Sequence, residues 1–136
     1  MSDFNSSLIA QIRAGGGHLS AGPFAGRQVL ILTTTGSQSK EKREAPLVYS
    51  RDGDDIVIIA SMGGAPRHPS WYHNIVANPR VTIEVGNDRF EADARVAPPD
   101  ERDRIWRLQT GDAPVFADYQ KRTDRTIPVV ILERVA

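Results

Sequence analysis

The chain has 136 residues, with 17 basic and 17 acidic side chains and no cysteine. This length predicts a single domain that buries about two thirds of its surface on folding. The absence of cysteine excludes disulfides, iron–sulfur clusters and a thiol nucleophile, and the balanced charge argues against nucleic-acid binding.

Apolar residues recur at helical spacing near the N-terminus: Phe4, Leu8, Ile9 and Ile12. They predict a short amphipathic helix over residues 4–14, which Gly15 ends. The apolar stripe could pack on the core, on a partner or at a membrane surface. Core packing is favoured, because a single arginine anchors a helix only weakly to lipid. We divide the chain into this helix with a Gly-rich linker, residues 1–23, and a cofactor-binding barrel domain, residues 24–136.

Six segments are apolar or alternate between apolar and polar residues, which predicts β-strands: 29–32, 45–49, 56–60, 81–85, 90–96 and 129–132. The first three are expected to be neighbours, with Arg51-Asp52-Gly53-Asp54 as the turn between the second and the third. No apolar run approaches the roughly 20 residues of a membrane span, and no signal peptide precedes the first helix, so we expect a cytoplasmic protein.

Three more helices are predicted between the strands: residues 70–76, 98–109 and 114–122. Short strands at hairpin spacing, with helices only at the ends and in one connection, are typical of an α+β protein. We therefore predict a small antiparallel barrel decorated by helices.

Several common types of site are missing from the sequence. His18, His68 and His73 have no metal-ligand spacing, so we expect no metal site. The glycines at 15–17 fail the dinucleotide-binding pattern, and there is no nucleophile elbow of the Gly-x-Ser-x-Gly type.

One group of residues has the composition of an anion site. Thr33-Thr34-Thr35-Gly36-Ser37 runs from a strand into a loop that carries Lys40, Lys42 and Arg43. Hydroxyl groups, backbone N–H groups at a glycine turn and nearby cations are what a phosphate requires. The alternative is an ordinary strand followed by a solvated loop, and composition alone favours that alternative.

A second group, residues 63–74, combines two glycines with Trp71-Tyr72-His73 and the amide of Asn74. Glycine allows close approach of a ligand, and the flat rings could pack against an aromatic cofactor. Composition alone again favours the simpler alternative, in which Trp71 anchors the core.

Together these segments resemble the deazaflavin (coenzyme F420)-dependent nitroreductase and quinone reductase family of actinobacteria. The matching stretches occur in family order: residues 24–36, 45–47, 63–74, 77–79 and 119–128. The resemblance implies a six-stranded antiparallel split β-barrel of the FMN-binding type, with an N-terminal helix and short peripheral helices. It overturns the simpler alternative for both groups.

The resemblance also implies the cofactor-binding residues. They are Thr33, Thr34, Thr35, Gly36, Ser37, Lys40, Lys42, Arg43, Pro46, Ser61, Met62, Gly63, Gly64, Ala65, Arg67, His68, Trp71 and Asn74. The phosphate and acidic tail of F420 are expected near the loop after Thr35, and its ring and ribityl arm along residues 63–74.

Four positions depart from the family pattern. Ser37-Gln38 replaces a usual Arg-Lys pair, Lys40 replaces a usual glycine, and Met62 stands where nitro-drug reductases often have lysine. Fewer cations weaken the binding of an acidic tail. FMN, which lacks that tail, is therefore the alternative cofactor.

The function implied is hydride transfer from reduced F420 to a quinone, nitro or enone acceptor. Tyr119 is the candidate catalytic residue, and Phe116 and Tyr119 are the candidate substrate-binding residues. The alternatives are an FMN-binding reductase or a non-catalytic F420 or lipid binder. A monomer or weak homodimer is expected, with peripheral membrane contact through the N-terminal helix left open. We interpret Asp124-Arg125 as a structural contact that fixes the last strand.

Overall fold

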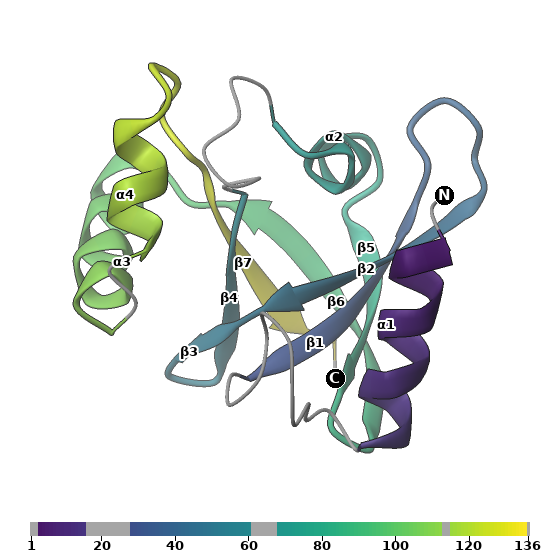
Figure 1. The fold of residues 1–136 in the computed structure, drawn as a ribbon. Coiled ribbons are helices and arrows are strands. Elements are labelled where there is room, and N and C mark those ends of the chain that lie inside the picture. The colour runs from purple at the N-terminus through teal and green to yellow at the C-terminus, as the bar shows by residue number, and fades with distance from the viewer. Residues whose placement is uncertain (1–2, 16–27, 61–67, 113–114, 136) are drawn as a thin grey trace.

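The computed structural model describes residues 3–15, 28–60, 68–112 and 115–135 (Figure 1). The helices are α1 (Asp3–Ala14), α2 (Ser70–Ala77), α3 (Pro99–Asp112) and α4 (Val115–Lys121). The strands are β1 (Val29–Thr35), β2 (Lys42–Val48), β3 (Ser50–Asp52), β4 (Asp55–Ile59), β5 (Arg80–Val85), β6 (Asp88–Val96) and β7 (Val129–Arg134). The four predicted helices are confirmed, with ends that differ by at most three residues.

All strands belong to one antiparallel sheet in the order β2-β1-β5-β6-β7-β4-β3. The two outer strands, β2 and β3, follow one another in the chain with only Tyr49 between them. The Tyr49 N–H donates to the Gln28 carbonyl oxygen at 3.1 Å. One bent stretch, residues 42–52, therefore supplies both edges of the sheet, and the sheet curls into the split barrel of the predicted α+β fold.

The predicted strand count and one predicted pairing were wrong. A seventh strand, β3, occupies part of the predicted turn, and the turn shortens to Gly53-Asp54. Gly53 has a φ of 63°, a conformation that glycine adopts without strain and that allows a tight turn. Strand β4 lies between β3 and β7 rather than beside β1 or β2, because β5 takes the second edge of β1.

The uninterrupted apolar run in β1 reflects burial on both faces of the sheet. Leu30 and Leu32 belong to the core inside the barrel, whereas Val29 and Ile31 pack on the outside against α1. A third apolar cluster forms where Ile105 of α3 packs on the outer side of β4 and β7. Helices thus cover two outer sides of the barrel, as Figure 1 shows.

The N-terminal helix packs on the barrel. Ile9 and Ile12 are buried against β1, which confirms the core-packing interpretation of their stripe. Arg13 fastens the end of the helix by donating to Glu84 at 2.9 and 2.7 Å and to Glu44 at 2.5 Å. The hydrogen bonds from Arg13 to Glu84 lower the pKa of the Glu84 carboxyl. Most of the Gly-rich linker, from residue 16 onward, lies outside the described residues, as does the side chain of Phe4.

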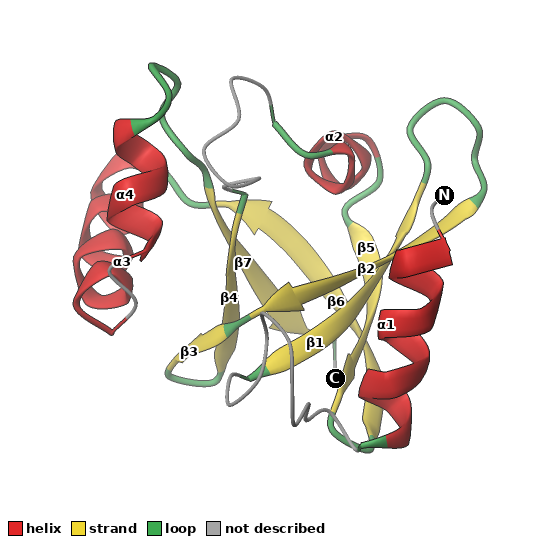
Figure 2. Ribbon diagram, viewed as in Figure 1, coloured by secondary structure: helices red, strands yellow, loops and turns green. Residues whose placement is uncertain are grey.

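Helix α2 lies across one end of the barrel (Figure 2). It begins at Ser70, directly after Pro69, and ends before Asn78-Pro79. Trp71 and Ile75 point into the interior cluster, so this helix closes the apolar core at that end. No helix in the described ranges is long and apolar enough to cross a membrane.

Candidate cofactor site

A cavity of about 580 Å³ lies between α2 and the loop that joins β1 to β2. Its lining consists of Thr34, Gly36, Ser37, Gln38, Ser39, Arg43, Glu44, Ala45, Pro69, Ser70, Trp71 and Asn74. Two segments that the sequence singled out separately, the threonine-glycine run and the motif around Trp71, therefore form the walls of one cavity.

Asn74 joins these two walls. Its Nδ2 donates to Thr34 Oγ1 at 3.0 Å, and its Oδ1 accepts from the Ser37 N–H at 3.0 Å. Thr34 and Asn74 are 1% and 7% exposed and are the buried polar residues of the described chain. A buried amide that satisfies both a donor and an acceptor fixes α2 relative to the end of β1.

The loop between β1 and β2 uses several of its backbone donors internally. The Gly36 N–H donates to the Glu41 carbonyl at 2.7 Å, the Lys40 N–H donates to the Gly36 carbonyl at 3.1 Å, and Asn74 takes the Ser37 N–H. These three N–H groups are therefore bonded within the protein, and a role of the loop backbone in holding an anion stays a prediction.

Gly36 lies close to Ser39 and to the backbone of Glu41. A Cβ atom there would lie 2.4 Å from Ser39 Oγ, which accepts a hydrogen bond from the Glu41 N–H at 3.2 Å. Lys40 adopts a φ of 62°, a left-handed conformation that favours glycine. The family's usual glycine at this position thus has a conformational reason, and a lysine here carries a backbone strain of about 1 kcal/mol.

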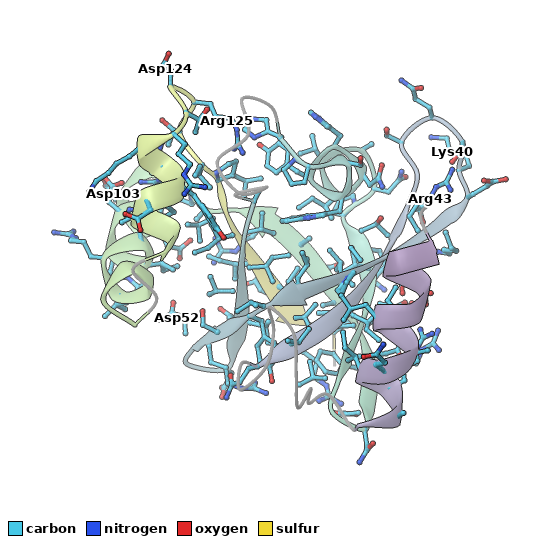
Figure 3. The ribbon with its side chains drawn as sticks, viewed as in Figure 1. Lys40, Arg43, Asp52, Asp103, Asp124 and Arg125 are labelled. Atoms are coloured by element: carbon cyan, nitrogen blue, oxygen red, sulfur yellow. The ribbon has the colours of Figure 1, made fainter. Side chains whose placement is uncertain are left out.

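Arg43 brings a positive charge to the cavity. It pairs across the strands with Thr34, so both side chains lie on the inner face of the sheet. Its guanidinium is half-exposed and lies 3.4 Å from the Glu41 carboxylate. Figure 3 places Arg43 and Lys40 at the same loop. The Lys40 ammonium donates to the Ser37 carbonyl at 3.3 Å. Ser37 belongs to the cavity lining, whereas Lys40 does not.

Trp71 is a core residue, as the simpler interpretation of its motif predicted. It is 8% exposed and belongs to the interior cluster, yet part of it lines the cavity. Its contact with a ring of the cofactor stays a prediction.

Other predicted residues lie elsewhere. The described ones outside the lining are Thr33, Thr35, Lys40, Lys42, Pro46 and His68. Thr33 and Pro46 share the outer face of the sheet with Ile31, and Lys42 donates to Thr35 Oγ1 at 3.1 Å. The residues Ser61, Met62, Gly63, Gly64, Ala65 and Arg67 lie outside the described residues, as does the side chain of Phe116.

Tyr119 is half-buried on α4, where the Arg122 guanidinium lies 5.7 Å from the centre of its ring. The structure does not bring Tyr119 into the cavity lining. Its proposed contact with a substrate stays a prediction.

Sequence reasoning missed Glu44, an acidic residue in the lining of a cavity that was expected to hold an anion. Glu44 pairs across the strands with Thr33, so its side chain lies on the outer face of the sheet, where Arg13 of α1 forms an ion pair with it. No local pattern reveals this, since the two residues come from distant parts of the chain. Among the residues described here, no three His, Asp or Glu side chains are grouped as a metal site would require.

A curled antiparallel barrel, with a cavity that joins a flat ring, buried hydroxyl and amide groups and one arginine, defines a cofactor-binding split barrel. The comparisons identify which one. Residues 8–134 match the model of the F420H(2)-dependent quinone reductase family, and the chain belongs to this family.

Named relatives agree with this family. An F420H(2)-dependent quinone reductase of Mycobacterium tuberculosis H37Rv is 46% identical over 108 residues, which cover 77% of this chain and 72% of the relative. A solved F420-H2 dependent reductase superposes with a TM-score of 0.70 at 40% identity, covering 77% of this chain and 93% of that one. A solved domain-swapped dimer gives 0.72 at 35% identity, covering 94% and 93%. A heme storage protein of Vibrio cholerae, at 14% identity, shares the fold alone, with a TM-score of 0.57 and coverage of 96% and 89%.

Proposed function

We propose that this protein reduces a quinone with F420H2, and that the cavity between α2 and the β1–β2 loop holds the cofactor. The observation that carries the proposal is the convergence of Arg43, Trp71 and Asn74 on one cavity of about 580 Å³ in a member of this family. Nitro and enone compounds remain alternative acceptors.

The residues present fit such a cofactor. Thr34, Ser37 and Ser39 offer hydroxyl groups and Arg43 a cation to a phosphate, while Trp71 offers an apolar face to a ring. When bound, the reduced cofactor supplies a hydride, which together with one proton reduces a quinone to a quinol. The chain itself binds and orients: Asn74 keeps the loop and α2 in register, and the packed interior beneath Trp71 excludes water from that wall.

We expect Arg43→Ala to weaken F420 binding about three- to tenfold at low ionic strength, and less at high salt. The arginine is half-exposed, so solvent screening reduces its contribution. The measurement is a fluorescence or calorimetric titration of the purified protein with F420 at two salt concentrations.

Arg89→Ala, which removes an exposed arginine from β6, is the matched control and should not change the affinity. A parallel titration with FMN tests the alternative, which is favoured by the presence of Ser37-Gln38 where a basic pair is usual. Tighter binding of FMN than of F420 would overturn the cofactor assignment, and an equal loss for both arginine variants would remove Arg43 from the site.

Tyr119→Phe is expected to lower the turnover of a quinone while leaving the affinity for F420 intact. The reason is that the family resemblance places a tyrosine on the substrate side at this position, and in Figure 1 the segment after α4 reaches the end of the barrel where α2 lies. Steady-state kinetics with a soluble quinone, together with the F420 titration, measure both properties. Unchanged turnover would remove the Tyr119 hydroxyl from the mechanism.

The cytoplasmic location and the monomeric or weakly dimeric state stay proposals. Peripheral membrane contact through α1 would require residues other than Ile9 and Ile12, which pack against β1.

A further inference from the structure

Arg125 contacts two residues that bracket a segment of the sequence the family resemblance assigns to the cofactor. Its Nη1 donates to the Ala60 carbonyl oxygen at 3.1 Å and lies 3.1 Å from His68 Nδ1. Ala60 directly follows β4, and His68 lies two residues before α2. In Figure 3, Arg125 points from the segment between α4 and β7 toward the start of α2, whereas the exposed Asp124 points away.

The chemistry of the pair fixes the state of His68. A guanidinium has only donors, so Nδ1 must be the acceptor in this contact. An accepting Nδ1 carries no proton, which makes the imidazole neutral with its hydrogen on Nε2. Protonation of Nδ1 would place two donors and two positive charges against each other.

Both partners of this contact are held by their surroundings. The His68 ring lies 4.5 Å from the Tyr72 ring, and His73 of the same helix lies 6.0 Å away. The Arg125 carbonyl accepts from Gln120 Nε2 at 2.7 Å. Burial lowers the pKa of His68, and the charges of Arg125 and His73 lower it further. Tyr72, His73 and Arg125 are the titratable and charged groups that face His68 from the described elements.

We propose that Arg125 is a positioning residue that ties the end of β4 to the start of α2 through neutral His68, and so sets the cavity wall that carries Trp71 and Asn74. Asn74 anchors the middle of α2 to β1 and the loop after it, whereas the Arg125 contact anchors the chain just before the helix begins. The role of Arg125 in cofactor binding rests on the proposed function, but the state of His68 does not.

The lowered pKa of His68 predicts that the Arg125–His68 contact depends on pH. A histidine whose native pKa is lowered favours the folded contact above its ordinary value of 6.5, and the contact is lost as the pH falls through the lowered native value. Affinity for F420 should therefore decline on the acid side, by about tenfold if the loss equals that of one hydrogen bond to a charged group.

The first test needs no cofactor. Nitrogen chemical shifts of the histidine rings in the labelled protein report the tautomer, and neutral His68 is expected to carry its proton on Nε2 at pH 7 to 8. Arg125→Met, which keeps the aliphatic stem and removes the donors, should yield mixed tautomers and a higher His68 pKa. A wild-type His68 with its proton on Nδ1, or one that Arg125→Met leaves unchanged, would overturn the inference.

The second test measures F420 affinity against pH. His68→Asn supplies an acceptor oxygen near the position of Nδ1 but cannot titrate, so the acid-side decline should disappear. His73→Gln, which changes an exposed histidine of α2, is the control and should retain the decline, moved to higher pH because the charge of His73 no longer lowers the pKa of His68. The inference fails if both variants keep the wild-type profile. A protein that binds no F420 at all would refute the proposed function and leave the first test valid.

Discussion

Asn74→Asp should weaken F420 binding at least tenfold while leaving the fold intact. The Thr34 hydroxyl can donate to a carboxylate as readily as it accepts from an amide, and the Ser37 N–H keeps its acceptor. The new negative charge lies in the cavity that would hold the phosphate, where a like charge costs about 1 to 4 kcal/mol. Titration with F420 and thermal unfolding, both at pH 8 to ionise the carboxyl, measure the two properties.

Two controls isolate the charge. Val76→Asp adds the same charge to an exposed position of α2 and should leave F420 affinity within twofold. Asn74→Leu keeps the size but leaves Thr34 Oγ1 and the Ser37 N–H without their partner, and should cost about 2 to 3 kcal/mol of stability. If Asn74→Asp bound F420 as tightly as the wild type, the anionic part of the cofactor would lie outside this cavity.

Gln120→Leu is expected to lower the free energy of unfolding by about 3 to 4 kcal/mol, and the melting temperature by roughly 10 °C. Gln120 Oε1 accepts from the Ile127 N–H at 3.0 Å and from Arg102 Nη2 at 3.2 Å, and Nε2 donates to the Arg125 carbonyl. Ile127 is fully buried, so its N–H would lose its partner without gaining water. Denaturant and thermal unfolding measure the loss.

Lys121→Leu is the matched control on the same helix. Lys121 is exposed, and its replacement should change stability by no more than about 0.5 kcal/mol. A similar small effect of Gln120→Leu would mean that another group satisfies the Ile127 N–H. The prediction also bears on Arg125, because Gln120 holds the carbonyl of the residue that contacts His68.

Much of the local structure could be predicted from the sequence. The apolar run of β1 and the alternation along β5 and β6 identified strands. A strand buried on both faces has a continuous apolar run, and a strand buried on one face alternates between apolar and polar residues. Proline and glycine marked the ends of α1 and α2. Strand β3 could not be predicted, since three polar residues form a strand only because β4 offers them an edge.

The candidate site, too, could be predicted from the sequence only in part. Arg43, Trp71 and Asn74 were found by motif, but the sequence treated the threonine run as one unit. The structure separates Thr34, which points into the barrel, from Thr33 on the outer face. That division depends on which face of β1 meets the interior, and both faces of this strand are apolar near its start.

By itself, the sequence determined the α+β class, the helices, most strands, the family and the residue types that suit an anionic ring cofactor. Only the tertiary structure decided which residues meet. Asn74 contacts Thr34 across 40 positions, and Arg125 contacts His68 across 57. Local periodicity predicts structure over a few helical turns or one hairpin. Contacts between residues far apart in the chain depend instead on how the strands pair and the sheet closes.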